Sequence, residues 1–256
     1  DDGLAVAIVG RRQATPYGLA VADRLARELA RLGVTVVSGL ARGIDAAAHR
    51  AALDAGGRTI AVLGNGLGVQ YPPEHAVLRT AIAKQGAVVS EFPIRETPEP
   101  GHFPQRNRVI SGLSLGVVVV EADERSGALI TARAALEQGR EVFAVPGNIL
   151  GTTSRGPHQL LREGATLVES AEDIVREIQA LASWVRRRPE PAAIEAAAPL
   201  PGPETDIYAA LGGSPELADD LAARVGIPAA IMAPALLALE LKGLVRRMAG
   251  PRYLKV

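Results

Sequence analysis

The strongest constraint on the fold of this chain is a regular alternation of short apolar runs with helical stretches. Several runs are continuous in Val, Ile and Leu, which is typical of strands buried on both faces of a parallel sheet. The alternation therefore predicts an α/β fold with a doubly wound, mostly parallel sheet. The predicted strands are Leu4–Val9, Val34–Val37, Thr59–Leu63, Ala87–Val89, Gly116–Val120, Glu141–Val145 and Thr166–Val168. The predicted helices are Tyr17–Leu32, Ile44–Ala55, Glu74–Lys84 and Leu129–Gln138.

The 256 residues are enough for one large domain and one small domain. Residues 183–203 carry consecutive arginines, alanines and repeated prolines, a composition typical of a linker. We expect a large domain over 1–182 and a small one over 204–256. The small domain should contain helix, turn, helix and hairpin, which is the order of a winged helix. Its expected parts are Glu216–Val225, a turn at 226–228, a helix to about Lys242, and the strands Leu244–Met248 and Arg252–Lys255.

Composition excludes several classes of function. The chain has no Cys, so disulfides, Cys-ligated zinc and thiolate catalysis are ruled out. Its 28 basic and 28 acidic residues give a formal charge of zero, which argues against a protein that coats nucleic acid with its whole surface. A local basic site remains compatible with this balance. No apolar run reaches the roughly 18 residues of a membrane span, so we expect no membrane span and a cytoplasmic location.

The common cofactor motifs are missing from the sequence. The run Gly64-x-Gly66-x-Gly68 lacks the third glycine of the dinucleotide fingerprint, which would fall at Val69. No Gly-Lys-Ser/Thr occurs, so there is no Walker A loop, and the four histidines show no metal-ligand spacing. We therefore expect neither a cofactor nor a metal.

Small residues, hydroxyls and arginines follow the predicted strands at their carboxyl ends, where open parallel sheets bind ligands. After the first strand come Gly10-Arg11-Arg12, and after the second come Ser38, Gly39, Arg42 and Gly43. Glycines let the backbone approach a ligand, the next helix start offers free N–H groups, and Arg42 adds a forked cation that suits phosphate. This pattern predicts an anion site.

Two further segments add to the predicted site. Ser126 and Gly127 precede another helix start, and two helix starts in one crevice could hold successive phosphates. Pro104 suits a first helical turn, which would bring Arg106, Asn107 and Arg108 near a helix start, where they could contact phosphates and base edges. The alternatives are ordinary caps and turns for the first segment and a surface ion-pair patch for the second.

Four titratable residues could suggest catalysis instead. Glu91 and Glu121 stand at strand ends, where they could act as acid and base or orient neighbouring arginines, and we favour the second role. Asp45 and His49 lie four residues apart on one predicted helix, where a structural pair is the better interpretation.

The same residues resemble the DNA-processing protein A family (DprA, also called Smf) over nearly all of residues 4–180. The resemblance rests on runs that occur in the family's order: Gly10-Arg11, Ser38-Gly39-Leu40-Ala41-Arg42-Gly43-Ile44-Asp45, Tyr71-Pro72, Ser90-Glu91, Phe103-Pro104 to Ser114, Glu121-Ala122, Ser126-Gly127-Ala128-Leu129-Ile130-Thr131 and Ala144-Val145-Pro146-Gly147. It implies an extended Rossmann-like domain that forms a homodimer, binds single-stranded DNA and helps to load the RecA recombinase in natural transformation. It implies no enzyme activity. The DNA contacts that motif and resemblance together suggest are Gly10, Arg11, Ser38, Gly39, Arg42, Gly43, Arg106, Asn107, Arg108, Ser126, Gly127 and Thr131.

Two other functions stay open at this point. A phosphoribohydrolase acting on nucleotides would need a Pro-Gly-Gly-x-Gly-Thr loop, which residues 125–131 do not provide. A winged-helix transcription regulator would need polar side chains on its recognition helix to read bases, and residues 229–242 offer only Glu240 and Lys242 as charged side chains. A protein-contact or dimer-supporting role for the small domain is therefore the better hypothesis, and auxiliary contact of its basic residues with the DNA backbone is the alternative.

Overall fold

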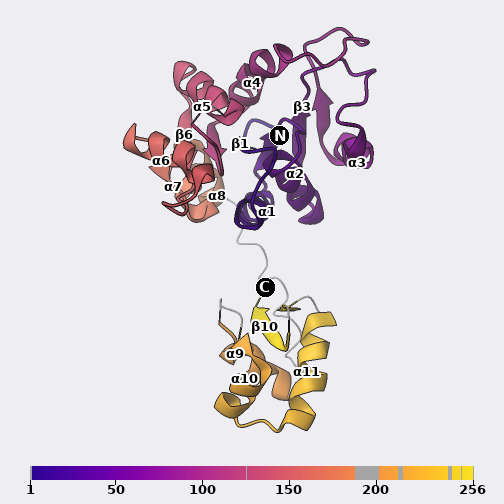
Figure 1. Cartoon of the computed structure of the whole chain (residues 1–256), viewed down its shortest axis with the longest axis vertical. Helices are drawn as coiled ribbons and strands as arrows, with labels where there is room; N and C mark the ends of the chain where they lie inside the picture. Colours follow the sequence, from indigo (N-terminus) through magenta and orange to yellow (C-terminus); the bar gives the residue numbers. More distant parts are fainter. Residues whose placement is uncertain are drawn as a thin grey trace. The chain divides into compact units, whose positions relative to one another are not determined.

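The computed structural model describes residues 2–124, 126–187, 202–212, 216–241, 244–248 and 250–255. The chain divides into two compact units, residues 1–188 and 189–256 (Figure 1).

The first unit is built on a seven-stranded parallel sheet. The strand order is β4-β3-β2-β1-β5-β6-β7, so the chain winds outward from β1 first in one direction and then in the other. This doubly wound order confirms the predicted fold class. The strands are β1 Ala5–Val9, β2 Thr35–Ser38, β3 Thr59–Val62, β4 Ala87–Val89, β5 Gly116–Val119, β6 Glu141–Ala144 and β7 Thr166–Leu167.

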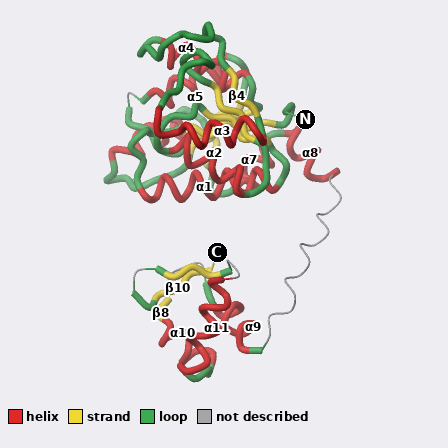
Figure 2. The backbone as a smooth tube through the Cα atoms, turned by 90° about the vertical axis from the view of Figure 1, so that its right-hand side faces the viewer, coloured by secondary structure: helices red, strands yellow, loops and turns green. Residues whose placement is uncertain are grey.

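Helices cover both faces of the sheet because alternate strand residues point to opposite sides. One core joins Val6, Ile8 and Val36 to helices α1, α2, α7 and α8, and the other joins Ala7, Val9 and Val117 to α4, α5 and α6. Figure 2 shows the strands between α4 and α5 on one side and α1 and α7 on the other. The helices are α1 Pro16–Arg31, α2 Ile44–Asp54, α3 Ala76–Gln85, α4 His102–Gly112, α5 Gly127–Glu137, α6 Arg155–Arg162, α7 Ala171–Glu177 and α8 Gln179–Arg187.

The strands and helices predicted for this unit are all present, with ends that differ by at most two residues, and the larger differences are at helix starts. The helix expected from Glu74 begins as the 3₁₀ turn Pro73–His75, and α3 starts at Ala76. Helix α5 begins at Gly127, two residues before its predicted start, because the side chain of Ser126 caps it by accepting a hydrogen bond from the Ala128 N–H.

The expected linker begins too early. Residues 183–187 belong to α8, which buries Leu181 in the core and whose Trp184 donates its indole N–H to the Leu32 carbonyl at 3.2 Å. Packing of these apolar side chains outweighs the arginine-rich composition that suggested a linker. Of the rest of the predicted linker, 188–201 lies outside the described residues, and Pro203 already belongs to the next helix, Pro203–Ala210.

The second unit is a winged helix, as predicted. Three helices pack around buried Ile207, Leu221, Leu236 and Leu239, and an antiparallel sheet of order β8-β10-β9 contains the predicted hairpin. The residues expected to open a helix at Glu216 instead form the short strand β8, which pairs with β10. The elements are α9 Pro203–Ala210, β8 Glu216–Leu217, α10 Ala218–Val225, α11 Ala229–Leu241, β9 Val245–Arg247 and β10 Arg252–Lys255.

Across the described ranges, no single helix has the length and apolar character needed to cross a membrane. The helical segments Ala218–Val225 and Ala230–Glu240 are together long and apolar enough for a span, but a bend of 112° separates them.

Candidate nucleic-acid interface

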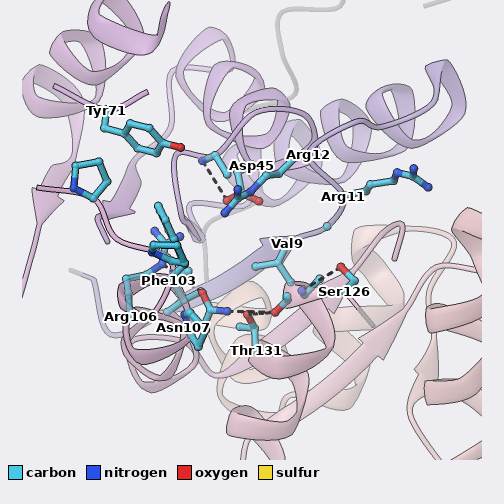
Figure 3. A pocket seen from close by; sticks show the side chains of 18 residues that line it. Val9, Arg11, Arg12, Asp45, Tyr71, Phe103, Arg106, Asn107, Ser126 and Thr131 are labelled. Atoms are coloured by element: carbon cyan, nitrogen blue, oxygen red, sulfur yellow. Dashed lines mark hydrogen bonds between the residues drawn. The ribbon is translucent and has the colours of Figure 1, made fainter. Parts of the chain in front are cut away.

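A cavity of about 550 Å³ lies where the winding of the large sheet changes direction. Strand β1 has β2 on one side and β5 on the other, and the loops that leave the carboxyl ends of parallel strands on either side of such a point form a crevice. The cavity is lined from one side by Arg12, Tyr71 and Phe103 and from the other by Ser126 and Thr131 (Figure 3). The predicted edge of the sheet therefore does carry a cavity.

The start of α5 faces this cavity. A Cβ atom on Gly127 would meet nothing within 4 Å, so the backbone there is open. Asn107 donates its side-chain N–H to the Gly127 carbonyl at 3.1 Å, and the hydroxyl of Thr131 donates to the same oxygen at 3.4 Å. The structure thus brings together Ser126, Gly127, Thr131 and Asn107, and their positive helix end can attract an anion.

The start of α2 is used by the protein itself. Gly43 has φ 74°, and a Cβ atom there would collide with the Arg11 carbonyl. The Ile44 N–H donates to that same carbonyl at 3.2 Å. The glycine therefore allows the loop after β1 to pack on the helix start. Of the two helix starts expected to face a strand of DNA, only that of α5 is open to the cavity.

Arg106 forms part of the cavity floor and is 5% exposed. It donates to the carbonyl oxygens of Gly39, at 2.7 Å, and of Val62, and its Nε donates to the Asn107 side chain at 3.3 Å. Burial lowers the pKa of Arg106 to about 10. Gly39 is required here because a Cβ atom would lie 2.7 Å from the guanidinium. These contacts make Arg106 a residue that holds the site together rather than a free phosphate donor.

Asp45 lies beside Arg106 and is also buried. Its carboxylate accepts hydrogen bonds from the N–H groups of Gly39 at 3.1 Å and Ala41 at 3.3 Å. Burial raises the pKa of Asp45, and the Arg106 charge and these two N–H groups oppose the rise. Ser38, another predicted contact, instead donates its hydroxyl to the Ile8 carbonyl at 2.6 Å and lies outside the lining of the cavity.

Two arginines line the cavity from the loop that follows Gly10. Arg11 lies 2.8 Å from Asp123 and points away from the aromatic side chains, whereas Arg12 lies over the Phe103 ring at 4.9 Å (Figure 3). Arg12 was not assigned a DNA contact from the sequence. Its place directly after the first strand, at the centre of the sheet, was the available signal.

Arg42 and Arg108 lie apart from this cavity. Arg42 pairs with Glu74 and lines a small neighbouring pocket that Phe103 also lines. Arg108 pairs with Glu91 beside an open hollow that also includes Phe92. Both side chains are more than half exposed. The predicted convergence of Arg42, Arg106 and Arg108 on one groove is therefore replaced by three separate positions along the sheet edge.

The titratable residues that could suggest catalysis are all engaged in the structure. Glu91 pairs with Arg108, as the favoured interpretation predicts. Glu121 instead accepts hydrogen bonds from the N–H and hydroxyl of Thr15 and so holds the start of α1. Asp45 and His49 do not pair with each other, because His49 contacts Thr59 at 2.6 Å. Among the described residues, no group of three acidic or histidine side chains could hold a metal ion.

Comparison with known families decides the identity of both units. Residues 2–179 match the family model described as DNA recombination-mediator protein A, and residues 189–251 match the DprA winged helix domain. The chain belongs to the DprA family. Protein Smf of Escherichia coli is 46% identical over 251 residues, which cover 96% of this chain and 66% of that protein. DNA processing protein DprA of Bacillus subtilis is 49% identical over 176 residues, 69% of this chain and 59% of that protein.

Two solved DprA structures resemble the chain. DNA processing protein A from Streptococcus pneumoniae has a TM-score of 0.64 and 46% identity, over 69% of this chain and 63% of that one. The protein from Helicobacter pylori, whose structure is described as giving insight into its single-stranded DNA binding mode, has a TM-score of 0.63 and 33% identity, over 70% of this chain and 81% of that one. The chain spans about two thirds or less of the curated relatives' length. These relatives do not favour the phosphoribohydrolase alternative.

Proposed function

We propose that the Rossmann-like unit binds single-stranded DNA in the cavity at the carboxyl edge of its sheet. The observation that carries the proposal is that this one cavity combines an open helix start, at Ser126 and Gly127, with a cation lying on an aromatic ring, at Arg12 and Phe103. Helix starts and arginines suit phosphates, and aromatic faces suit unpaired bases. The single-stranded DNA binding of the Helicobacter pylori relative supports this assignment.

The two sides of the cavity have different tasks in this proposal. A phosphate would lie at the start of α5, where Gly127 leaves the backbone accessible and Arg11 is near the opening. The adjoining base would lie against Phe103, Tyr71 and Arg12, whose flat groups offer stacking surfaces. Arg106, Asn107 and Gly39 would act from beneath by fixing the floor. Arg42 and Arg108 would contact phosphates further along the strand.

The larger role that we propose is that of a recombination mediator without catalytic activity. Glu91 and Glu121 support this because both carboxylates are bound by other side chains rather than aimed into the cavity. The family's name supports a role in recombination. The complete proposal includes loading of the RecA recombinase on incoming DNA in natural transformation, a homodimer formed through the Rossmann-like unit, and a cytoplasmic location.

A salt titration tests the DNA-binding proposal. The logarithm of the affinity for single-stranded oligonucleotides should fall linearly with the logarithm of salt concentration, because each neutralised phosphate releases counterions. Duplexes of the same sequence should bind more weakly at every salt concentration. Equal affinity for single strands and duplexes, or no salt dependence, would contradict the proposal.

Replacing Arg12 tests the site within the protein. Arg12→Ala removes the cation from the Phe103 ring and should weaken single-strand binding roughly tenfold, the size of about one lost cation–π or base-stacking contact. Arg162→Ala is the matched control, because this exposed arginine ends α6 at the opposite edge of the sheet. Equal losses in the two variants would indicate a general charge effect and no site at the cavity.

The partners are tested separately. Light scattering should give twice the mass of one chain, and RecA should be retained on immobilised protein in the presence of single-stranded DNA. A monomer at micromolar concentration would remove the dimer from the proposal, and absence of RecA retention would remove the loading role, while either result leaves the DNA site intact.

A further inference from the structure

The glycine run Gly64-Asn65-Gly66-Leu67-Gly68 makes room for the segment that covers one side of the cavity. A Cβ atom on Gly64 would lie 2.8 Å from the Phe103 ring. A Cβ atom on Gly66 would collide with the Pro93 carbonyl, and one on Gly68 would lie 2.7 Å from the Ile94 carbonyl. Gly64 therefore leaves space for Phe103, and Gly66 and Gly68 together leave space for Pro93 and Ile94.

Hydrogen bonds hold the same segment to the glycine run. The Gly66 N–H donates to the Glu96 carbonyl at 2.9 Å, and the Gly68 N–H donates to the Ile94 carbonyl at 2.6 Å. The run is itself fixed, because the buried Asn65 side chain donates to the Gly66 and Val69 carbonyls at 3.0 and 2.9 Å. The glycine run is thus a fixed support for residues 93–103, which we call the seat, rather than a loop that binds a ligand.

Residues 92–101, which we call the strap, lead from this seat to α4. Pro98 and Pro100 of the strap line the cavity together with Phe103. Proline fixes φ, so the strap has few conformations available between its attachment at Glu96 and the start of α4 at His102. The strap therefore forms one wall of the cavity, and the glycine run determines where that wall stands.

We propose that this seated strap is what makes the cavity selective for unpaired DNA. This inference rests on the proposed function. A walled cavity of about 550 Å³ can take a base only if the base is unpaired and can turn away from its neighbours. The bases of a duplex are paired and stacked inside the double helix, so they cannot enter the cavity. Without the wall, the cavity would open toward Arg42 and Arg108 and become part of a shallow basic surface. The phosphates of a duplex can reach such a surface.

The test compares two glycine-to-alanine changes. Gly66→Ala places a methyl group against the Pro93 carbonyl and should displace the strap, which then has to be ordered on binding. We expect roughly tenfold weaker single-strand binding and a smaller ratio of single-strand to duplex affinity. Gly3→Ala is the matched control, because this exposed glycine precedes β1 outside the strap, its φ is not positive, and its Cβ would meet nothing within 4 Å. It should leave both affinities unchanged.

Hydrogen exchange supplies a readout that does not depend on DNA. Amides of residues 92–101 should exchange faster in Gly66→Ala than in the wild-type protein, while the sheet strands keep their protection. If Gly66→Ala does not fold, the double variant Pro98→Gly with Pro100→Gly loosens the strap without touching its seat and should change the affinity ratio in the same direction.

The outcomes separate the two proposals. A wild-type protein without preference for single strands refutes the proposed function, whatever the strap does. A wild-type protein that prefers single strands, together with a loosened strap and an unchanged affinity ratio, refutes the strap's role alone. Unchanged exchange in Gly66→Ala shows that the glycine run is not the seat.

Discussion

Arg106 lies beneath the cavity as a buried cation whose Nε and Nη1 donate to the protein's own amide and carbonyl oxygens. Its neighbour Asp45 is buried as well, so each group supplies the counter-charge that the other needs. Removal of one partner leaves an uncompensated charge in a low-dielectric interior, which costs far more than the loss of a surface ion pair.

Arg106→Ala should therefore lower the free energy of unfolding by about 3 to 5 kcal/mol. Urea denaturation followed by circular dichroism measures this loss. Arg108→Ala, two residues away on the same helix and mostly exposed, is the control and should change stability little. Equal stability of the wild-type protein and Arg106→Ala would show that the buried contacts contribute nothing.

His49 makes stability depend on pH. Thr59 donates its hydroxyl to the Val36 carbonyl, so the His49 Nδ1–H must donate to Thr59, and Nε2 is left buried without a partner. Burial lowers the pKa of His49 from 6.5 to about 3. Below pH 6.5 the His49 side chain therefore binds a proton in the unfolded chain but stays neutral in the folded protein.

The contribution of His49 to the free energy of unfolding is fully present above pH 6.5. It is lost as the pH falls toward 3, and the loss is about 4 to 5 kcal/mol at most. Unfolding of the wild-type protein and His49→Asn, measured from pH 7 to pH 4.5, should show a shallower decline for the variant, which keeps a donor for Thr59 but does not titrate. Parallel pH profiles would assign the acid sensitivity to other groups.

The arginines show what a single sequence can and cannot predict about a site. The motifs placed Arg11, Ser126 and Gly127 at the correct edge of the sheet, because loops after parallel strands must meet there. Whether an arginine is free or buried depends on what packs against it. The sequence alone could not distinguish Arg106, which is buried, from Arg12, which is exposed, although both lie near the Phe103 ring.

At the scale of elements, the carboxylate that follows β5 acts as the anchor of α1. Glu121 accepts from both the N–H and the hydroxyl of Thr15, the N-cap of that helix, and Gly18 is needed because a Cβ atom there would collide with the carboxylate. A negative charge at a helix start also interacts favourably with the helix dipole.

Glu121→Gln should therefore lower stability by roughly 1 to 2 kcal/mol while single-strand binding stays the same. Thermal unfolding and fluorescence anisotropy with a labelled oligonucleotide measure the two quantities. Retained stability with lost binding would instead place Glu121 in the DNA site.

Elements with strong apolar periodicity were predictable to within one or two residues at most of their ends, and the weaker ones were not. Strands β1, β2, β3 and β5 are short apolar runs that are buried along their whole length, which makes their ends predictable. Helix α8 was missed because its stability comes from the contacts of Leu181 and Trp184 with the large domain rather than from its own composition. Strand β8 exists only through its pairing with β10, which local sequence does not encode.

At the scale of the whole molecule, the two units have separate cores, and every residue that lines the cavity belongs to the first. The exposed side chains of α11 include Ile231 and Leu237, so this helix offers little polar surface for reading bases. The second unit is therefore expected to add little to single-strand affinity.

A protein truncated after Arg187 should bind single-stranded oligonucleotides within about twofold of the full chain, since a contact worth 1.4 kcal/mol would change affinity tenfold. Residues 202–256 expressed alone should show no sequence-selective binding to duplex DNA. Anisotropy measurements on the three proteins decide the matter, and selective binding by the small unit would revive the hypothesis of a transcription regulator.

Three arginines along this edge of the sheet are each paired with an acid: Arg11 with Asp123, Arg42 with Glu74 and Arg108 with Glu91. At these positions phosphate and carboxylate compete for the same guanidinium. A phosphate can bind the arginine only by displacing the carboxylate, which stays nearby because it belongs to the same folded protein. The displaced acid competes again at every moment of the bound state. In the proposed function, this competition weakens each phosphate contact at these three arginines, so bound DNA is released one phosphate at a time.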